Sequence, residues 1–399
     1  MNVGLCNHGQ ECSWFVTFFR VWLQKKGVIM QFIRTNELKT GMRLARPIYN
    51  KKGVLLFERN SKLTPQAIES VHNFGLLGIY VLDPAEPLPP MSDEDIEFER
   101  FQTMAVFSIK EEIERILATG KRGRLEFTVG MLIKRFGHLD GKINFYQNLR
   151  SKDDYIYRHS LNVAILCAMM THVLNIRLDE KNAVMHAALM HDVGKLKISQ
   201  DVLYDQTMTE EMHLHILNAQ SQDGDLIERT VADGVVVKRI CMQVLRVQME
   251  MLRGEKDIQT AKLSTGAKIL LVANRYDELT AMSLSGTAES EVKALKEFRD
   301  RPDIYEPQIV DALIKSINIL TPGASVSLNT GEKALILSEN PRDILRPMVL
   351  SFRDNSIIDL GLKVNWDIEI EDIMKTMDNR YIINTDALAL AGYLKKEGE

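Results

Sequence analysis

The sequence predicts a mainly helical protein that carries a small β-containing unit at each end. From about residue 93 to residue 320 the apolar residues recur every three or four positions, which is typical of amphipathic helices. Before and after this stretch the apolar residues alternate in short runs separated by turn residues, which indicates short strands. We therefore expect an all-helical body over residues 93–320, flanked by two small β-units.

The N-terminal unit is expected over residues 30–82. The turn residues Asn-Lys-Lys-Gly at positions 50–53 separate two short apolar runs and predict a hairpin. Thr64 and Pro65 are residue types that favour the N-cap and the first position of a helix. We expect a small α+β module in this part of the chain.

A linker is expected over residues 83–92, because four of the chain's 11 prolines fall there. Ser92 then follows as a candidate N-cap. The body is expected to contain helices in segments with three-to-four spacing: 124–149, 156–176, 179–193, 225–253, 262–283 and 288–299.

The sequence predicts a β-containing unit at the C-terminal end of the chain and a separate leader at the N-terminal end. After residue 320 the period changes to two around a turn at residues 329–331, which predicts a β-containing unit over residues 321–399. Residues 1–29 precede Met30, which reads like the natural start of a domain. We expect this leader to be disordered or to reflect a misassigned start, so translation begins at either Met1 or Met30.

Composition narrows the classes of function. The net charge is -4, so no global basic field recruits nucleic acid or an anionic membrane. The apolar segment 13–23 is shorter than the roughly 20 residues that a membrane span needs. The four cysteines are scattered, which fits reduced thiols and a cytoplasmic protein. We expect neither nucleic acid nor a membrane as a partner.

The string HDVGK at residues 191–195 gives the clearest chemical signal, together with His159 about one helix upstream. Adjacent His191 and Asp192 at a helix end place a nitrogen and a carboxylate oxygen side by side. A histidine from another helix supplies a third donor. Two histidines and one carboxylate suit Fe(II), Mn(II) or Zn(II) and leave positions for water and a substrate oxygen. These three residues are the predicted metal ligands.

Gly194 and Lys195 extend this signal toward phosphate chemistry. Gly194 permits a tight exit from the helix, and Lys195 offers a fixed positive charge for a phosphate. Asp192 and Lys195 are therefore the candidate catalytic residues. The alternative is structural, with His191 and Asp192 capping a helix and His159 lying in the core.

These residues resemble, in order and spacing, the HD-GYP family of bacterial cyclic-di-GMP phosphodiesterases. The likeness covers about residues 124–320 and rests on the strings DDYIYRHSLNVA, AALMHDVGKLKIS, VLYDQTMTEE and AKILLVANRYDELT. It implies that the helical body is an HD/HD-GYP domain that holds metal ions. The resemblance assigns His159 as the first metal ligand, His191 and Asp192 as the motif pair, and Lys195 as the phosphate-contacting lysine.

The chain departs from the family pattern at later positions. A family histidine falls on or near Gln220, the paired histidines of the GYP signature fall near Leu245 and Arg246, and the last metal-binding aspartate falls on Asn274. Gln220 and Asn274 are thus weak candidate ligands. A binuclear site needs more donors than His159, His191 and Asp192 supply. We predict that the second metal is lost and that one divalent ion or none is bound.

Other histidines and aspartates are weaker candidates, and none is expected to replace the missing ligands. Each is expected to lie in solvent, in the core, in a loop or at a helix cap: His172, His186, His213, His215, Asp223, Asp225 and Asp233.

Two functions follow from this combination. The first is a degenerate HD-GYP-like protein of cyclic-di-GMP signalling that binds the nucleotide or a protein partner, with weak or no hydrolysis. The second is a metal-dependent phosphodiesterase for cyclic-di-GMP or another nucleotide that works with one ion, with Lys195 and Arg246 neutralising phosphate charge. A purely structural domain is the third reading. The small β-units suit contacts with a partner or with a second copy in a homodimer.

Overall fold

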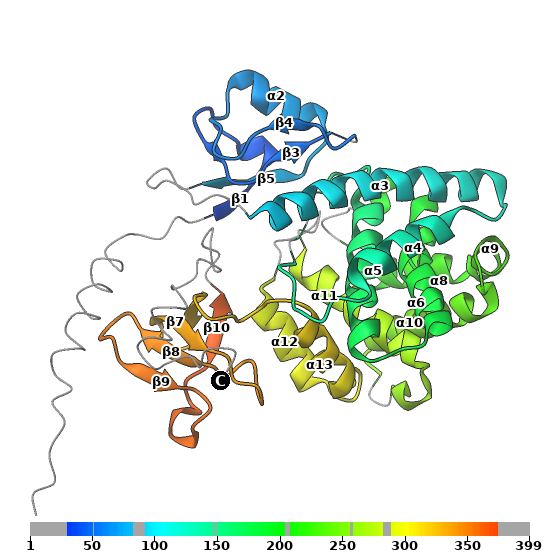
Figure 1. Ribbon diagram of the computed structural model, residues 1–399. Helices are drawn as coiled ribbons and strands as arrows, with labels where there is room; N and C mark the ends of the chain where they lie inside the picture. Colours follow the sequence, from blue (N-terminus) through cyan, green and yellow to red (C-terminus); the bar gives the residue numbers. More distant parts are fainter. Residues whose placement is uncertain are drawn as a thin grey trace, which may run out of the picture. The chain divides into compact units, whose positions relative to one another are not determined.

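The computed structural model describes residues 30–50, 52–82, 92–145, 147, 150–203, 208–255, 258–281 and 289–373. The chain divides into two compact units. Of the described residues, one unit contains those within 32–79 and 92–319, and the other contains those within 30–31, 80–82 and 320–373. The expected leader and the expected linker lie outside the described residues, apart from Ser92. Figure 1 colours the elements along the sequence.

The N-terminal module contains short strands and one helix. Its elements are β1 (Met30–Arg34), η1 (Thr35–Glu37), β2 (Arg43–Leu44), β3 (Ile48–Tyr49), β4 (Leu55–Phe57), α2 (Pro65–Asn73) and β5 (Gly78–Leu82). Strands β1, β5 and β2 form a sheet in that order, and β3 pairs antiparallel with β4. The predicted hairpin at residues 50–53 is therefore confirmed. Thr64 caps α2 by accepting a hydrogen bond from the Ala67 amide, as its sequence position indicated.

The body is helical throughout, as predicted. Its elements are α3 (Asp93–Thr119), α4 (Leu125–Phe136), α5 (Tyr155–Val173), α6 (Leu178–Met190), η2 (Val193–Lys197), α7 (Gln200–Leu203), α8 (Glu210–Ser221), α9 (Gly224–Thr230), α10 (Gly234–Leu252), η3 (Thr260–Lys262), α11 (Thr265–Thr280), α12 (Glu291–Asp300) and α13 (Pro307–Ser316). Every residue from Ile156 to Thr171 in α5 is buried, so this helix has no solvent-facing stripe. Helix α5 packs against α3, α4, α6, α11 and α13 and forms the centre of the body.

Two of the predicted helical segments are longer than the helices that the structure shows there. In the segment 124–149, α4 ends at Phe136 with Gly137 as its C-cap, and no further helix follows among the described residues of this segment. The segment 225–253 is broken between α9 and α10 at Asp233, which adopts a left-handed conformation with φ 49°. Helix α8 was not among the segments predicted from three-to-four spacing, although the sequence placed His213 and His215 on a helix. Among the described residues no helix is sufficiently long and apolar to cross a membrane.

The C-terminal unit contains a five-stranded antiparallel sheet with the strand order β10-β6-β7-β8-β9. Its strands are β6 (Ser325–Leu328), β7 (Lys333–Ser338), β8 (Met348–Ser351), β9 (Ile357–Asp359) and β10 (Ile370–Ile373), and η4 (Lys363–Asn365) precedes the last strand. Gly331 has φ 78° in the turn between β6 and β7, a conformation that glycine adopts at little cost. The predicted β-unit is therefore confirmed where the structure describes it.

Candidate metal centre

Three helical elements bring the predicted metal ligands together. His159 lies in the first turns of α5, His191 is the C-cap of α6, and Asp192 directly precedes η2. All three side chains are buried, and one ligand atom from each lies within 4.8 Å of the other two. The helix end places His191 and Asp192 side by side, and the packing of α5 on α6 supplies the third donor.

Hydrogen bonds fix which nitrogen each histidine presents. The Nδ1 atom of His191 lies 2.9 Å from the carbonyl oxygen of Ala188, and a carbonyl only accepts. The Nδ1 atom of His159 lies 2.6 Å from Oδ2 of Asp277, which also accepts when ionised. Both Nδ1 atoms therefore carry the proton in the neutral imidazoles. The two Nε2 lone pairs remain and face each other at 3.1 Å.

Asn274 on α11 completes a cluster of electron-pair donors. Its Oδ1 atom lies 2.8 Å from Nε2 of His159 and 2.9 Å from Nε2 of His191. Its Nδ2 atom donates to Glu278 at 3.0 Å, which keeps the carbonyl oxygen turned toward the histidines. Three acceptor atoms thus converge with no proton donor among them. A cation or an added proton among these atoms would stabilise this arrangement.

Burial disfavours the added proton. It lowers the pKa of His191 below the ordinary histidine value, although Asp192 acts in the opposite direction. A neutral His191 presents its Nε2 lone pair, as metal coordination requires. Two imidazole nitrogens, the Asp192 carboxylate and the Asn274 amide oxygen form a donor set that fits one divalent ion such as Fe(II), Mn(II) or Zn(II).

Both oxygens of Asp192 already accept hydrogen bonds. The Lys195 ammonium donates to Oδ2 at 2.6 Å, and the Gln220 amide donates to Oδ1 at 2.9 Å. Burial, the largest single effect, opposes ionisation of Asp192, but the charges around it and the hydrogen bond from Lys195 together hold the pKa of the carboxyl below its usual range. Burial, the largest single effect, lowers the pKa of Lys195, but the attraction and hydrogen bond of Asp192 together with the charge of Glu278 raise it above its ordinary value. Asp192 and Lys195 thus form a charged pair.

Comparison with known proteins agrees with this geometry. Residues 156–277, which span the cluster from α5 to α11, match the HD domain family. The chain carries an HD domain. The cyclic di-GMP phosphodiesterase PA4108 of Pseudomonas aeruginosa is 23% identical over 207 residues, which are 51% of this chain and 49% of that relative. The match therefore spans about half the length of the relative. No solved structure matches the chain.

Three residues at the positions of the missing family ligands do not act as metal ligands in this arrangement. Gln220 faces Asp192 with its amide N–H, so in this arrangement it acts as a hydrogen-bond donor. Leu245 is buried, whereas Arg246 is exposed and donates to the carbonyl oxygen of Gln259 at 3.2 Å. No hydrogen bond or ion pair in the described part of the chain connects Arg246 to the three ligands.

The remaining candidates lie at the surface, in the core or in structural ion pairs. His213 and His215 are exposed on α8, and His172 contacts Asp140 at 2.9 Å. His186 is buried and bonded to the carbonyl oxygen of Asn182 at 2.9 Å. The three weaker aspartates serve locally: Asp223 pairs with Lys197, Asp225 pairs with Lys238, and Asp233 lies at the break before α10.

Sequence reasoning missed two residues that organise the HD domain site. Glu278 orients Asn274 and lies four residues after it, a spacing that places both side chains on one helix face. Arg150 donates to both oxygens of Asp277 at 2.8 and 2.6 Å. Arg150 lies 127 positions from Asp277, so no local pattern indicated that pair.

Proposed function

We propose that this chain is a degenerate HD-GYP-like protein of bacterial cyclic-di-GMP signalling. It binds one divalent ion and acts by binding the nucleotide or a protein partner, with weak or no hydrolysis. The named activity of the matching relative supports the signalling class. The observation that carries the degenerate role is the engagement of both Asp192 oxygens, one by Lys195 and one by Gln220.

The loss of a second ion follows from the groups around Asp192. Two-metal sites hold their ions about 3.5–4 Å apart, with a ligand shared between them. In this chain the two Asp192 oxygens instead accept hydrogen bonds from the ammonium of Lys195 and the amide N–H of Gln220. Both groups carry positive charge or partial positive charge, so they repel a second cation. They also satisfy the carboxylate oxygens that would bridge the two ions.

The four donors have distinct roles in holding one ion. His159 and His191 would bind through Nε2, Asp192 would offset charge, and Asn274 would add a neutral oxygen. A bound divalent ion supplies Lewis-acid polarisation of a phosphoryl oxygen and a lowered pKa for a water. Lys195 lies beside Asp192 with its side chain 23% exposed, so it can meet a phosphate of the nucleotide.

A second candidate is a working phosphodiesterase for cyclic-di-GMP or another nucleotide with this reduced site. The convergence of His159, His191 and Asn274 on one point favours it, because that arrangement is organised for a cation. The two candidates share the ion and differ in turnover.

One experiment separates them. The full chain is purified anaerobically, its iron, manganese and zinc contents are measured, and cyclic-di-GMP binding and hydrolysis are assayed with each ion resupplied. We expect one ion per chain, nucleotide binding and negligible turnover. Linear dinucleotide or GMP formed at enzyme-like rates, and abolished by His191→Ala, would establish the phosphodiesterase. Two ions per chain, or neither ion nor nucleotide, would overturn the proposal.

A further inference from the structure

A buried arginine joins the histidine cluster to the rest of the HD domain. Arg150 and Asp277 are fully buried, and one guanidinium nitrogen of Arg150 donates to both Asp277 oxygens. Asp277 in turn holds Nδ1 of His159 at 2.6 Å. Arg150 and Asp277 thus form a buried ion pair. An ionised Asp277 fixes the proton of His159 on Nδ1 and leaves Nε2 for the ion.

The N-terminal module holds the segment from which Arg150 projects. The Leu77 amide donates to the carbonyl oxygen of Arg150 at 3.0 Å, and Leu76 forms an antiparallel bridge with Ser151. Arg46 donates to the carbonyl oxygen of Gln147 at 2.7 Å. The backbone of Gln147, Arg150 and Ser151 is therefore tied to residues 46–77 of this module, which belong to the same compact unit as the HD domain.

The Gln147 side chain provides a second connection to the same point. Its Nε2 atom donates to the Thr280 hydroxyl at 2.8 Å, and its Oε1 atom accepts from Asn162 at 2.9 Å. Asn162 also donates to Asp277 at 2.8 Å. A displacement of the segment would therefore disturb Asp277 through both Arg150 and Asn162.

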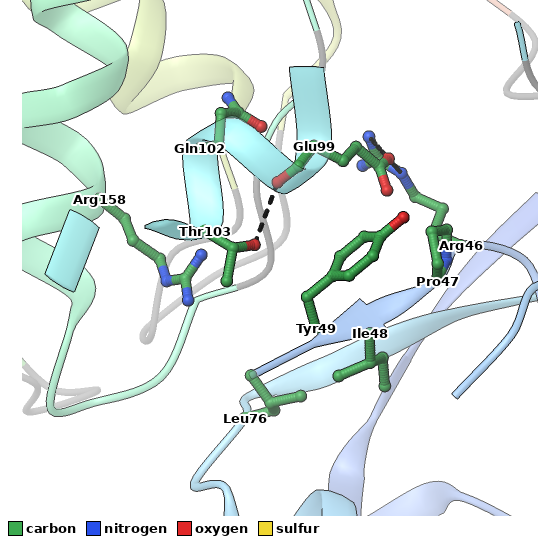
Figure 2. A pocket seen from close by; sticks show the side chains of 9 residues that line it. All are labelled: Arg46, Pro47, Ile48, Tyr49, Leu76, Glu99, Gln102, Thr103 and Arg158. Atoms are coloured by element: carbon green, nitrogen blue, oxygen red, sulfur yellow. Dashed lines mark hydrogen bonds and ion pairs between the residues drawn. The ribbon is translucent and has the colours of Figure 1, made fainter. Parts of the chain in front are cut away.

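The junction is not filled on the module side. A cavity of about 60 Å³ lies between Arg46 and Tyr49 of the module and Glu99 and Thr103 of α3, and Arg158 of α5 also lines it. Figure 2 shows the Tyr49 side chain pointing from the module toward α3, with the Arg46 guanidinium beside the Glu99 carboxylate. Packing at this junction is therefore incomplete.

We propose that Arg150 is a positioning residue through which the N-terminal module controls the orientation of His159, and thereby the affinity of the centre for its ion. This rests on the proposed single-ion site. Arg150 touches neither the ion nor the nucleotide; it acts through Asp277. The module is thus a regulatory element, since a movement of Gln147, Arg150 or Ser151 alters the orientation of His159.

Arginine-to-lysine substitutions in the full chain test this relation. Arg150→Lys keeps the positive charge but loses the guanidinium hydrogen bonds to both Asp277 oxygens. Arg46→Lys weakens the hydrogen bond from the module to the carbonyl oxygen of Gln147. Arg346→Lys is the matched control, because Arg346 also bonds several carbonyl oxygens but lies in the C-terminal unit. The readouts are the Kd for Mn²⁺ and Zn²⁺ from chelator competition and, without metal, the ¹⁵N shifts that report the His159 tautomer.

We expect Arg150→Lys to weaken metal binding by about 10- to 100-fold. Arg46→Lys should weaken it by about 2- to 30-fold. Both should reduce the Nδ1-protonated population of His159, and Arg346→Lys should change neither readout. Unchanged affinity and tautomer in both variants would overturn the inference. If wild type binds no ion, the proposed function fails while the tautomer still tests Arg150. If Arg150→Lys does not fold, the metal affinity and the His159 tautomer of Arg46→Lys test the inference alone, and no change in either would overturn it.

Discussion

The side-chain oxygen of Asn274 lies 2.8 Å from Nε2 of His159, where a carboxylate would complete a set of two histidines and two acids. The amide keeps the shape of that ligand and removes its charge. The centre therefore retains four donor atoms with one negative charge among them, that of Asp192. Such a site holds a divalent ion less strongly than one with a second carboxylate.

Asn274→Asp should therefore tighten binding of Mn²⁺ and Zn²⁺ by at least about tenfold. Opposite unit charges about 4 Å apart attract by about 4 kcal/mol at an effective dielectric constant of about 20, and a factor of ten needs only about 1.4 kcal/mol. Chelator competition against wild type gives the ratio of the two dissociation constants.

The same substitution should destabilise the metal-free protein, because the new carboxylate replaces the N–H that Asn274 donates to Glu278. Asn340→Asp serves as the control, since Asn340 donates to the carbonyl oxygen of Arg346 in the C-terminal unit. It should leave the metal affinity unchanged. Equal affinities for Asn274→Asp and wild type would show that Oδ1 does not contact the ion.

Gly194→Ala should lower the free energy of unfolding by about 1–3 kcal/mol, because its new methyl group overpacks the interior. A Cβ at this position would lie 2.7 Å from Oδ2 of Asp223 and 2.7 Å from Cα of Gln220. Backbone cannot move aside as a flexible side chain can, so η2 and Lys195 must shift. Urea denaturation measures the loss, and metal affinity should fall with it.

Gly130→Ala provides the matched control for this experiment. Gly130 lies within α4, and nothing lies within 4 Å of a Cβ built there. The substitution should stabilise the protein by about 0.5–1 kcal/mol, since alanine favours a helix over glycine. A gain in stability for Gly194→Ala as well would contradict the close approach of η2 to α8.

The sequence predicted most of the fold, because helix caps, turns and periodicity are local signals. Thr64 and Ser92 both cap the helices that they were expected to begin. Local signals also explain the errors. A continuous helical period concealed the break at Asp233, although aspartate is one of the few residues that adopt a left-handed conformation and this one was expected in a loop or at a helix cap.

The candidate site could be predicted only in part. His159, His191 and Asp192 were identified from their residue types and spacing, and the structure brings them together. The roles of Arg150 and Gln220 could not be read from the sequence. Each depends on a contact with a residue far along the chain, Asp277 in one case and Asp192 in the other.

Gln220→Glu should destabilise the metal-free protein by about 1–3 kcal/mol, the usual cost of removing a buried hydrogen-bond donor from its acceptor. The new carboxylate would face Oδ1 of Asp192, which now accepts from the Gln220 amide at 2.9 Å. Thermal unfolding with EDTA gives the loss. Added Mn²⁺ should restore more stability to this variant than to wild type, because the two acids attract a cation. An unchanged transition in EDTA would show that the Gln220 amide does not bind Asp192.

His186 should make the protein lose stability as the pH falls below about 6.5, the ordinary histidine pKa of the unfolded chain. Burial lowers the pKa of His186 in the folded protein, and its Nε2 atom is buried without a hydrogen-bond partner among the described residues. Between the two pKa values the unfolded chain binds more protons, so stability is full above pH 6.5 and declines as the pH falls toward the folded pKa. The slope contributed by one such group is at most about 1.4 kcal/mol per pH unit.

Urea denaturation of wild type and His186→Leu between pH 7.5 and 5.0 measures this contribution. The variant should lose less stability than wild type over that range, because it removes the group that must take up a proton in the interior. His213→Gln on the exposed face of α8 is the control and should follow the wild-type curve. Parallel curves for wild type and His186→Leu would place the acid sensitivity of the fold elsewhere, since a histidine that titrates equally in both states contributes no slope.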